Sequence, residues 1–183
     1  MTDESLHELA DAAQKGDLEA FSEIVARMQQ PLFRYCFPML GNRQDAEDTV
    51  QEVFVRAYAN LHKYRENRNF TGWLFTIAHR LCLNRLKKRS RWRMLLAKAA
   101  NEEAERSGNV EPAEEEGLSL LASLQPKQRE LIVLKVLHEM SYEEISEIVG
   151  VPAINLRKQF ERTRRKLQRE HPNQMKRGIT YEH

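Results

Sequence analysis

The fold is decided by a segment between residues 45 and 93, which contains DAEDTVQEVF (45–54), FTGWLFTIA (70–78) and NRLKKR (84–89). The first stretch places carboxylate and amide side chains on the outer face of an expected helix. The other two stretches belong to a second expected helix, which begins apolar and becomes strongly basic. The loop at 62–69, between the two helices, mixes basic, aromatic and amide side chains. An acidic face beside such a basic surface predicts a protein that binds a protein partner and nucleic acid at once.

Two plainer interpretations of this segment stay open. Acidic side chains near the start of a helix also favour the helix dipole, and spacing alone does not separate that role from a docking face. The loop composition suits unpaired bases, because cations bind phosphates and rings stack on bases, but it also suits a polar connector.

Around this segment the chain predicts helices almost throughout, because apolar residues recur three or four positions apart and strand-type alternation is absent. We expect Asp17 to cap a long helix that Pro31 kinks or splits, and Gly41 to end it. Two further helices are expected at about residues 44–61 and from Phe70 onward. The predicted fold class is therefore all-α.

The aromatic residues of the helix from Phe70 fall on two faces. Trp73 shares a stripe with Phe70 and Leu74, which predicts that it lies in the core. Phe75 lies off that stripe, so we expect it to be exposed and available to nucleic acid.

The charges of the 183-residue chain are segregated, although the net charge is only +2. Basic residues gather at 85–93 and 157–169, and acidic residues at 102–116. Two basic clusters predict two separate contacts with nucleic acid, the alternative being two solvated helix faces. Residues 98–117 are acidic with few apolar anchors, which predicts a flexible linker between domains at 1–97 and 118–183.

The second domain has the pattern of a helix-turn-helix. Ser141 and Glu144 form an expected capping box, Gly150 a tight turn, and a basic helix starts near Pro152 with Ile154 among its apolar positions. A generic helical hairpin is the alternative. The side chains expected on the outer face of this helix are Asn155, Arg157, Lys158, Gln159, Arg162, Arg164 and Arg165.

The remaining composition argues against other classes of protein. Cys36 and Cys82 lie in apolar helical pattern, and the histidines lack metal-ligand spacing. Neither a nucleotide-binding glycine loop nor a catalytic constellation is visible. We expect no metal, no cofactor, no small-molecule substrate, no enzymatic activity and no membrane insertion, in a cytoplasmic protein.

In their order and spacing these motifs resemble bacterial RNA polymerase sigma factors of the small extracytoplasmic-function (ECF) group of the sigma-70 family. LGN at 40–42 with the acidic stretch at 45–54 resembles the core-polymerase-binding region. The stretch at 70–78 resembles the promoter-melting and minus-ten region. LQP at 124–126, SYEEI at 141–145 and RTRRKL at 162–167 resemble the minus-thirty-five domain.

The resemblance implies sigma region 2 at 1–97, sigma region 4 at 118–183, and promoter-specific transcription initiation under the control of an anti-sigma factor. The residues implied in binding the clamp helices of the largest polymerase subunit are Asp45, Asp48, Gln51 and Glu52, with Phe54 packing beneath them. Those implied in binding the minus-ten element and the melted strand are Lys63, Tyr64, Arg65, Asn67, Arg68, Asn69, Phe75, Arg80, Asn84, Arg85, Lys87 and Lys88. Those implied at the minus-thirty-five duplex are Ser141 and the seven outer residues of the basic helix.

The sequence departs from the family pattern at the DNA-reading positions. Arg80 stands where an Asn is common, Asn84 stands where an Asp is common, and PAINLRKQF at 152–160 replaces the usual recognition-helix sequence. We therefore assign no promoter sequence. The alternative function is a conventional helix-turn-helix regulator that binds duplex operators without polymerase, but it leaves the basic segment at 62–93 without a role. A helical scaffold leaves both basic clusters unexplained.

Overall fold

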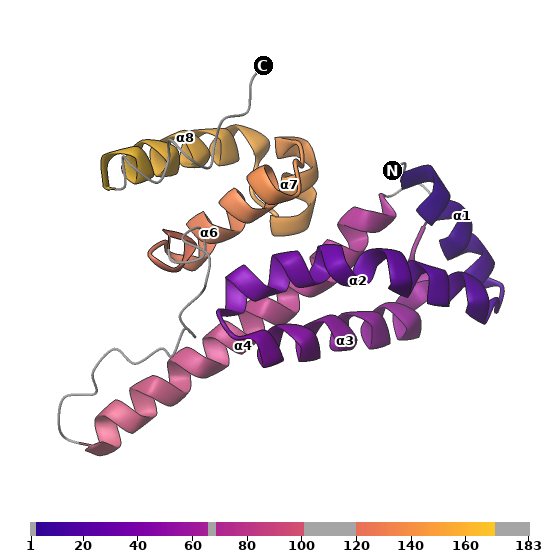
Figure 1. The fold of residues 1–183 in the computed structure, drawn as a ribbon, viewed down its shortest axis with the longest axis horizontal. Helices are drawn as coiled ribbons and strands as arrows, with labels where there is room; N and C mark the ends of the chain where they lie inside the picture. Colours follow the sequence, from indigo (N-terminus) through magenta and orange to yellow (C-terminus); the bar gives the residue numbers. More distant parts are fainter. Residues whose placement is uncertain (1–2, 66–68, 101–119, 171–183) are drawn as a thin grey trace. The chain divides into compact units, whose positions relative to one another are not determined.

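The computed structural model describes residues 3–65, 69–100 and 120–170, and all regular structure within these ranges is helical (Figure 1). The chain forms two compact units, Met1–Val110 and Glu111–His183. Unit 1 contains α1 (Asp3–Gln14), α2 (Leu18–Leu40), α3 (Arg43–Asn60), the 3₁₀ turn η1 (Leu61–Lys63) and α4 (Phe70–Ala100). Unit 2 contains α6 (Pro126–Ile132), the π-helical turn η2 (Val133–Leu137), α7 (Tyr142–Val149) and α8 (Ala153–Glu170). The expected all-α class with two small helical domains is confirmed.

The ends of the helices in unit 1 follow local signals in the sequence. The Asp17 carboxylate accepts hydrogen bonds from the backbone N–H groups of Glu19 and Ala20 at 2.9 and 3.0 Å and so caps α2. Gly41, with a φ of 66°, ends α2 in the left-handed conformation that glycine adopts readily. Asn42 then caps α3 by accepting from the N–H of Asp45 at 2.8 Å.

Pro31 is expected to kink or split α2, and the split is wrong. The helix continues through both Pro31 and Pro38 to Leu40. Each proline removes one backbone hydrogen bond, but Leu32, Tyr35 and other residues of this half of α2 are completely buried. The packing of that apolar face maintains the helix where the local sequence would break it.

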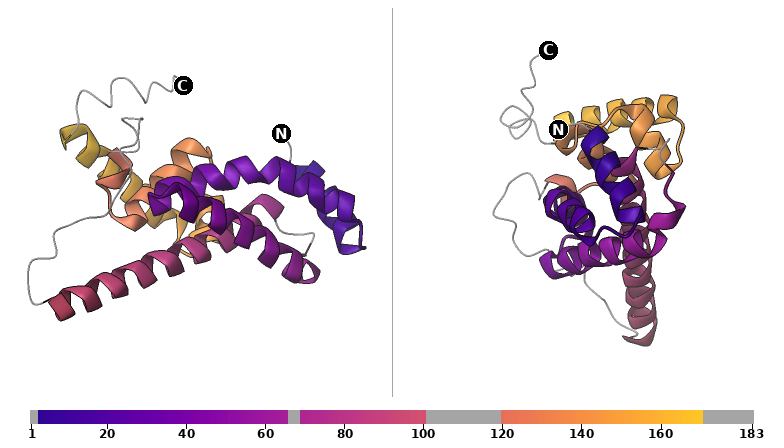
Figure 2. Two further views of the ribbon diagram at one scale, coloured as in Figure 1. Left: turned by 60° about the horizontal axis from the view of Figure 1, so that its bottom comes forward. Right: turned by 90° about the vertical axis from the view of Figure 1, so that its right-hand side faces the viewer.

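The core of unit 1 forms where α2, α3 and the first half of α4 lie side by side (Figures 1 and 2). Phe75 belongs to this core. Only 1% of its surface is exposed, and its ring meets Tyr35 edge-on with the centroids 5.5 Å apart. The expected exposure of Phe75 is therefore wrong, because α4 packs against α1, α2 and α3 and buries a stripe wider than one-sided periodicity predicts. Trp73, expected in the core, is only half-buried.

Helix α1 holds the segment that follows α3. The Gln14 side-chain amide donates to the carbonyl oxygens of Leu61 and Tyr64 at 2.7 and 2.9 Å. The Tyr64 hydroxyl lies 2.7 Å from Nδ1 of His7, and its ring packs against Phe70 at a centroid distance of 4.9 Å. Tyr64 is only 6% exposed, so its expected availability for stacking on a base is wrong. Instead, the Tyr64 ring packs the residues that follow η1 against the core of unit 1.

Unit 2 is built around a helix-turn-helix formed by α7 and α8. Ser141 and Glu144 form the expected capping box: the Glu144 carboxylate accepts from the Ser141 N–H at 2.7 Å, and the Ser141 hydroxyl accepts from the Glu144 N–H at 3.1 Å. Gly150 ends α7 with a φ of 72°. Ile145 of α7 and Leu156 of α8 are both buried, so the core of unit 2 fixes the orientation of α8 against α7.

The expected acidic linker at 98–117 falls largely outside the described residues. Residues 98–100 still belong to α4, so that helix runs past the expected domain boundary at residue 97. No Gly or Pro occurs between residues 73 and 107 to end it earlier. The limits of the two domains, 1–97 and 118–183, stay a prediction.

Candidate protein and nucleic-acid interfaces

The outer face of α3 presents acidic and amide side chains to solvent. Asp48 and Gln51 are exposed, whereas Asp45 and Glu52 are half-buried. Phe54 is only 8% exposed, which confirms the expectation that it packs beneath this face. Among the expected docking residues, Asp48 and Gln51 are therefore the most accessible to a partner.

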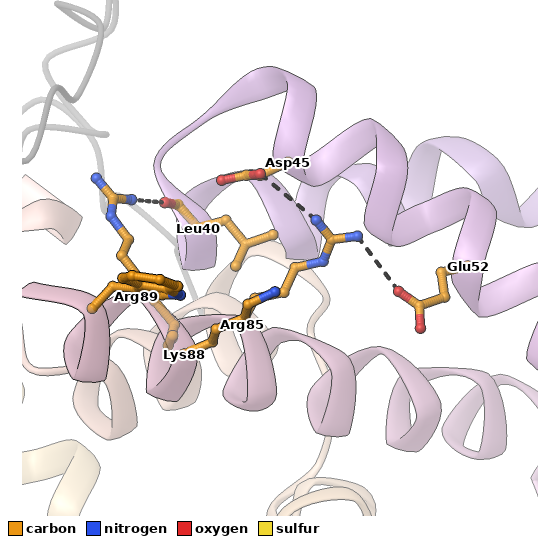
Figure 3. A pocket seen from close by; sticks show the side chains of 8 residues that line it. Leu40, Asp45, Glu52, Arg85, Lys88 and Arg89 are labelled. Carbon is orange, nitrogen blue, oxygen red and sulfur yellow. Dashed lines mark hydrogen bonds and ion pairs between the residues drawn. The ribbon is translucent and has the colours of Figure 1, made fainter.

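Arg85 of α4 bridges the two half-buried acids of α3 (Figure 3). Its guanidinium lies 3.4 Å from the Glu52 carboxylate and 3.6 Å from that of Asp45. Glu52 also pairs with Arg56 at 2.6 Å, one turn along α3. One turn further along α4, Arg89 donates to the Leu40 carbonyl at 3.3 Å. Two cations of the expected DNA-binding helix therefore join α4 to α2 and α3.

Two grooves flank the acidic face of α3. The first has a volume of about 490 Å³, and its residues are Leu40, Asp45, Glu52, Arg85, Leu86, Lys88, Arg89 and Trp92. The second, between α2 and α3, has a volume of about 500 Å³ and includes Gln51 and Phe54 in its wall. A partner that contacts Asp48 and Gln51 thus meets concave surfaces on both sides of α3.

The remaining residues expected at the minus-ten element lie in several different environments. Lys63, Arg65, Arg80, Asn84, Lys87 and Lys88 are all exposed. Asn69 is half-buried, and its side-chain oxygen accepts from the N–H of Gly72 at 2.6 Å, so it caps α4. Asn67 and Arg68 lie outside the described residues.

The outer face of α8 is polar and basic, as the sequence predicts. The seven residues expected there are all exposed: Asn155, Arg157, Lys158, Gln159, Arg162, Arg164 and Arg165. The opposite face buries Leu156, Thr163 and Leu167. Ser141 differs from this group, because its hydroxyl is engaged in the capping box and also donates to Glu144 at 2.7 Å.

Sequence reasoning missed Tyr142, which supports the start of the basic helix. The Arg157 guanidinium lies 5.4 Å from the centroid of its ring, and the Lys135 ammonium lies 4.9 Å from it. Burial, together with the nearby Glu161 carboxylate, raises the pKa of the Tyr142 phenol above its ordinary value. No spacing in the sequence signals this cluster, because its three members come from three different elements.

The described residues offer few features of other kinds of site. No group of three metal-ligating side chains occurs within 3–65, 69–100 and 120–170. Cys36 and Cys82 are both buried, and neither forms a disulfide. In the same ranges, no helix combines the length and apolar character needed to span a bilayer.

Comparison with known proteins assigns both units to one family. The model of sigma-70 region 2 matches residues 24–92, and that of sigma-70 region 4 matches residues 116–167. The ECF RNA polymerase sigma factor SigW of Bacillus subtilis is 34% identical over 85% of this chain and 91% of its own length. SigE of Mycolicibacterium smegmatis is 31% identical over 82% of this chain and 61% of its own length.

The solved structures agree with the sequence matches. The structure of CnrH in complex with the cytosolic domain of CnrY superposes with a TM-score of 0.69 at 26% identity, over 91% of this chain and 96% of the other. The chain belongs to the sigma-70 family of RNA polymerase sigma factors, in its extracytoplasmic-function group.

Proposed function

We propose that this chain directs core RNA polymerase to promoters by docking through α3, binding the minus-ten region through α4 and reading the minus-thirty-five duplex through α8. The observation that carries the proposal is that each matched region is a separately folded unit, and that the two units present different surfaces. Unit 1 exposes an acidic and amide-bearing face on α3, and unit 2 exposes a basic face on α8. The chemistry of RNA synthesis belongs to the polymerase, and this chain acts in the cytoplasm without a catalytic site of its own.

The docking contact is proposed to centre on Asp48 and Gln51. Both side chains are exposed and lie between two grooves into which a helical partner can pack. The half-buried Asp45 and Glu52 hold Arg85 and contribute to the structure of the face. The partner surface is proposed to be the clamp helices of the largest polymerase subunit.

Control by an anti-sigma factor is proposed from membership of the ECF group, and a solved relative has a bound protein partner. CnrH was solved in complex with the cytosolic domain of CnrY. A protein that covers the α3 face or the α8 face would block docking or promoter reading. We therefore expect a partner of this kind to inhibit transcription directed by this chain.

Transcription in vitro tests the function. The full chain is mixed with purified bacterial core polymerase and fragmented genomic DNA, and the transcript starts are sequenced. We expect discrete starts that require the chain and share two upstream elements. If such starts are missing while the chain alone shifts duplex DNA, the conventional regulator is favoured instead.

Two substitutions test the docking face. Asp48→Ala with Gln51→Ala is expected to weaken binding to core polymerase about tenfold or more, because truncating one partner of a charge pair buried in an interface costs about 2–5 kcal/mol and about 1.4 kcal/mol corresponds to tenfold. Glu8→Ala, an exposed acid of α1, is the matched control and should bind normally. Unchanged affinity in the double variant would remove α3 from the docking contact.

A further inference from the structure

The first turn of α8 carries an exposed apolar side chain. Ile154, which the sequence groups with the apolar positions of the helix, is 59% exposed. The other large exposed apolar residue in the described part of unit 2, Leu137, is 37% exposed and lies outside α8. A β-branched side chain at an exposed helical position adds nothing to helix stability relative to alanine. The side chain is therefore available to a ligand without cost to the fold.

Ile154 lies on the face of α8 that points away from the core. Steps of three or four residues place it in one line with the exposed cations Lys158, Arg162 and Arg165. The buried Leu156 and Thr163 lie on the opposite side. A helix that binds DNA through its basic face therefore brings Ile154 into the groove with these cations.

The position of Ile154 in the first turn decides what it meets there. The amino-terminal residues of a recognition helix contact base edges in the major groove, and later residues contact phosphates. Phosphates and most base edges offer charges or hydrogen-bonding groups, which an isoleucine does not match. The C5-methyl group of thymine is the apolar group that the major groove presents.

We propose that Ile154 contacts the methyl group of a thymine in the minus-thirty-five element and thereby sets the base preference at one position. The inference rests on the proposed function, because it needs α8 to read duplex DNA. Asn155, the exposed neighbour, supplies an amide for an adjacent base edge, and Lys158 supplies a cation one turn later. Ile154 thus adds an apolar contact to a surface otherwise made of polar side chains.

Replacing thymine by uracil tests the contact, because it removes the methyl group and leaves base pairing unchanged. The holoenzyme is bound to promoter duplexes in which each thymine of the minus-thirty-five element is replaced in turn. One replacement is expected to weaken wild-type binding about fourfold, the value of one buried methyl group. Ile154→Ala should bind the thymine and uracil forms of that duplex equally, and Ile154→Val should keep the preference.

Leu137→Ala is the matched control, since it also truncates an exposed apolar residue of unit 2 and should retain the thymine preference. The proposal is overturned if Ile154→Ala and wild type respond equally to every uracil, or if the element contains no thymine. In either of those outcomes, the holoenzyme still binds its promoter specifically. Failure of the holoenzyme to recognise any promoter would instead overturn the proposed function, so the two failures are distinguishable.

Discussion

The two basic helices α4 and α8 carry similar runs of Arg and Lys, yet they place their charges differently. In α4, Arg85 lies between the carboxylates of Asp45 and Glu52, and Arg89 binds the Leu40 carbonyl. In the described part of unit 2, the ion pairs of α8 join residues of α8 itself, Arg164 with Glu161 and Lys166 with Glu170, each at 3.8 Å.

The difference shows that a basic run in a sequence overstates the charge available to a nucleic acid. Helix α4 packs along α2 and α3 and uses part of its charge to hold them. Helix α8 buries one apolar stripe and leaves its basic face to solvent. The exposed cations in the described part of α4 are Arg80, Lys87, Lys88, Arg91 and Arg93.

The largest expected effect is on the free energy of unfolding, which should respond to a substitution in the buried part of α4 but not to one on the exposed face of α8. Phe75→Ala is expected to destabilise unit 1 by about 3–5 kcal/mol, because it leaves a cavity against Tyr35. Ile154→Ala should change stability by less than about 0.5 kcal/mol. Urea unfolding of the full chain measures both by helical circular dichroism, and tryptophan fluorescence isolates unit 1, because both tryptophans, Trp73 and Trp92, lie there. An unchanged midpoint for Phe75→Ala would contradict its place in the core.

Local signals made much of the fold predictable from the sequence. Asp17, Asn42 and Ser141 are helix caps because their short side chains reach backbone N–H groups only two or three residues away. Gly41 and Gly150 end helices because the left-handed conformation suits glycine. Such signals lie within a few residues of their effect, so a single sequence contains them.

The parts of the candidate site that prediction missed depend on distant partners. Phe75 is buried by Tyr35, forty positions earlier, and Tyr64 is held by His7 and Gln14 of α1. Arg85 is engaged by acids of a different helix. Periodicity describes one helix at a time, so it cannot reveal which charged or aromatic side chain a neighbouring helix covers.

The second expected effect is on how promoter affinity depends on salt concentration. Arg162→Ala is expected to lower the slope of log affinity against log salt concentration by about one for promoter binding, because each phosphate contact releases one counterion. Arg85→Ala should leave that slope unchanged, since the wild-type side chain is engaged by α3. Holoenzyme binding to one promoter duplex across a salt series measures both variants. Equal slope changes would contradict the contrast between the two helices.

A third and smaller effect concerns the support of Arg157. Tyr142→Leu is expected to weaken binding to the minus-thirty-five element about two- to fivefold, which corresponds to the 0.5–1 kcal/mol typical of an exposed cation–π contact. Tyr142→Phe keeps the ring face and should bind nearly as wild type. In an Arg157→Ala background, Tyr142→Leu should have no further effect on promoter affinity. A loss that persists in that background would mean that Tyr142 acts through something other than Arg157.

The smallest expected effect is the coupling between Arg85 and Glu52. Their side chains are 32% and 35% exposed and 3.4 Å apart, so solvent screens the pair and its coupling energy should be a few tenths of a kcal/mol. Unfolding of Arg85→Ala, Glu52→Ala and the double variant gives this energy, with the exposed pair Arg43 and Glu47 as the control cycle.

A weak coupling means that a protein docking on α3 can displace Arg85 from Glu52 at little cost in free energy. The Asp45 carboxylate, 3.6 Å from the same guanidinium, would still hold Arg85 against α3 and away from DNA. A coupling of several kcal/mol would instead mean that solvent does not screen the pair and that Glu52 is a main support of the packing of α4 on α3.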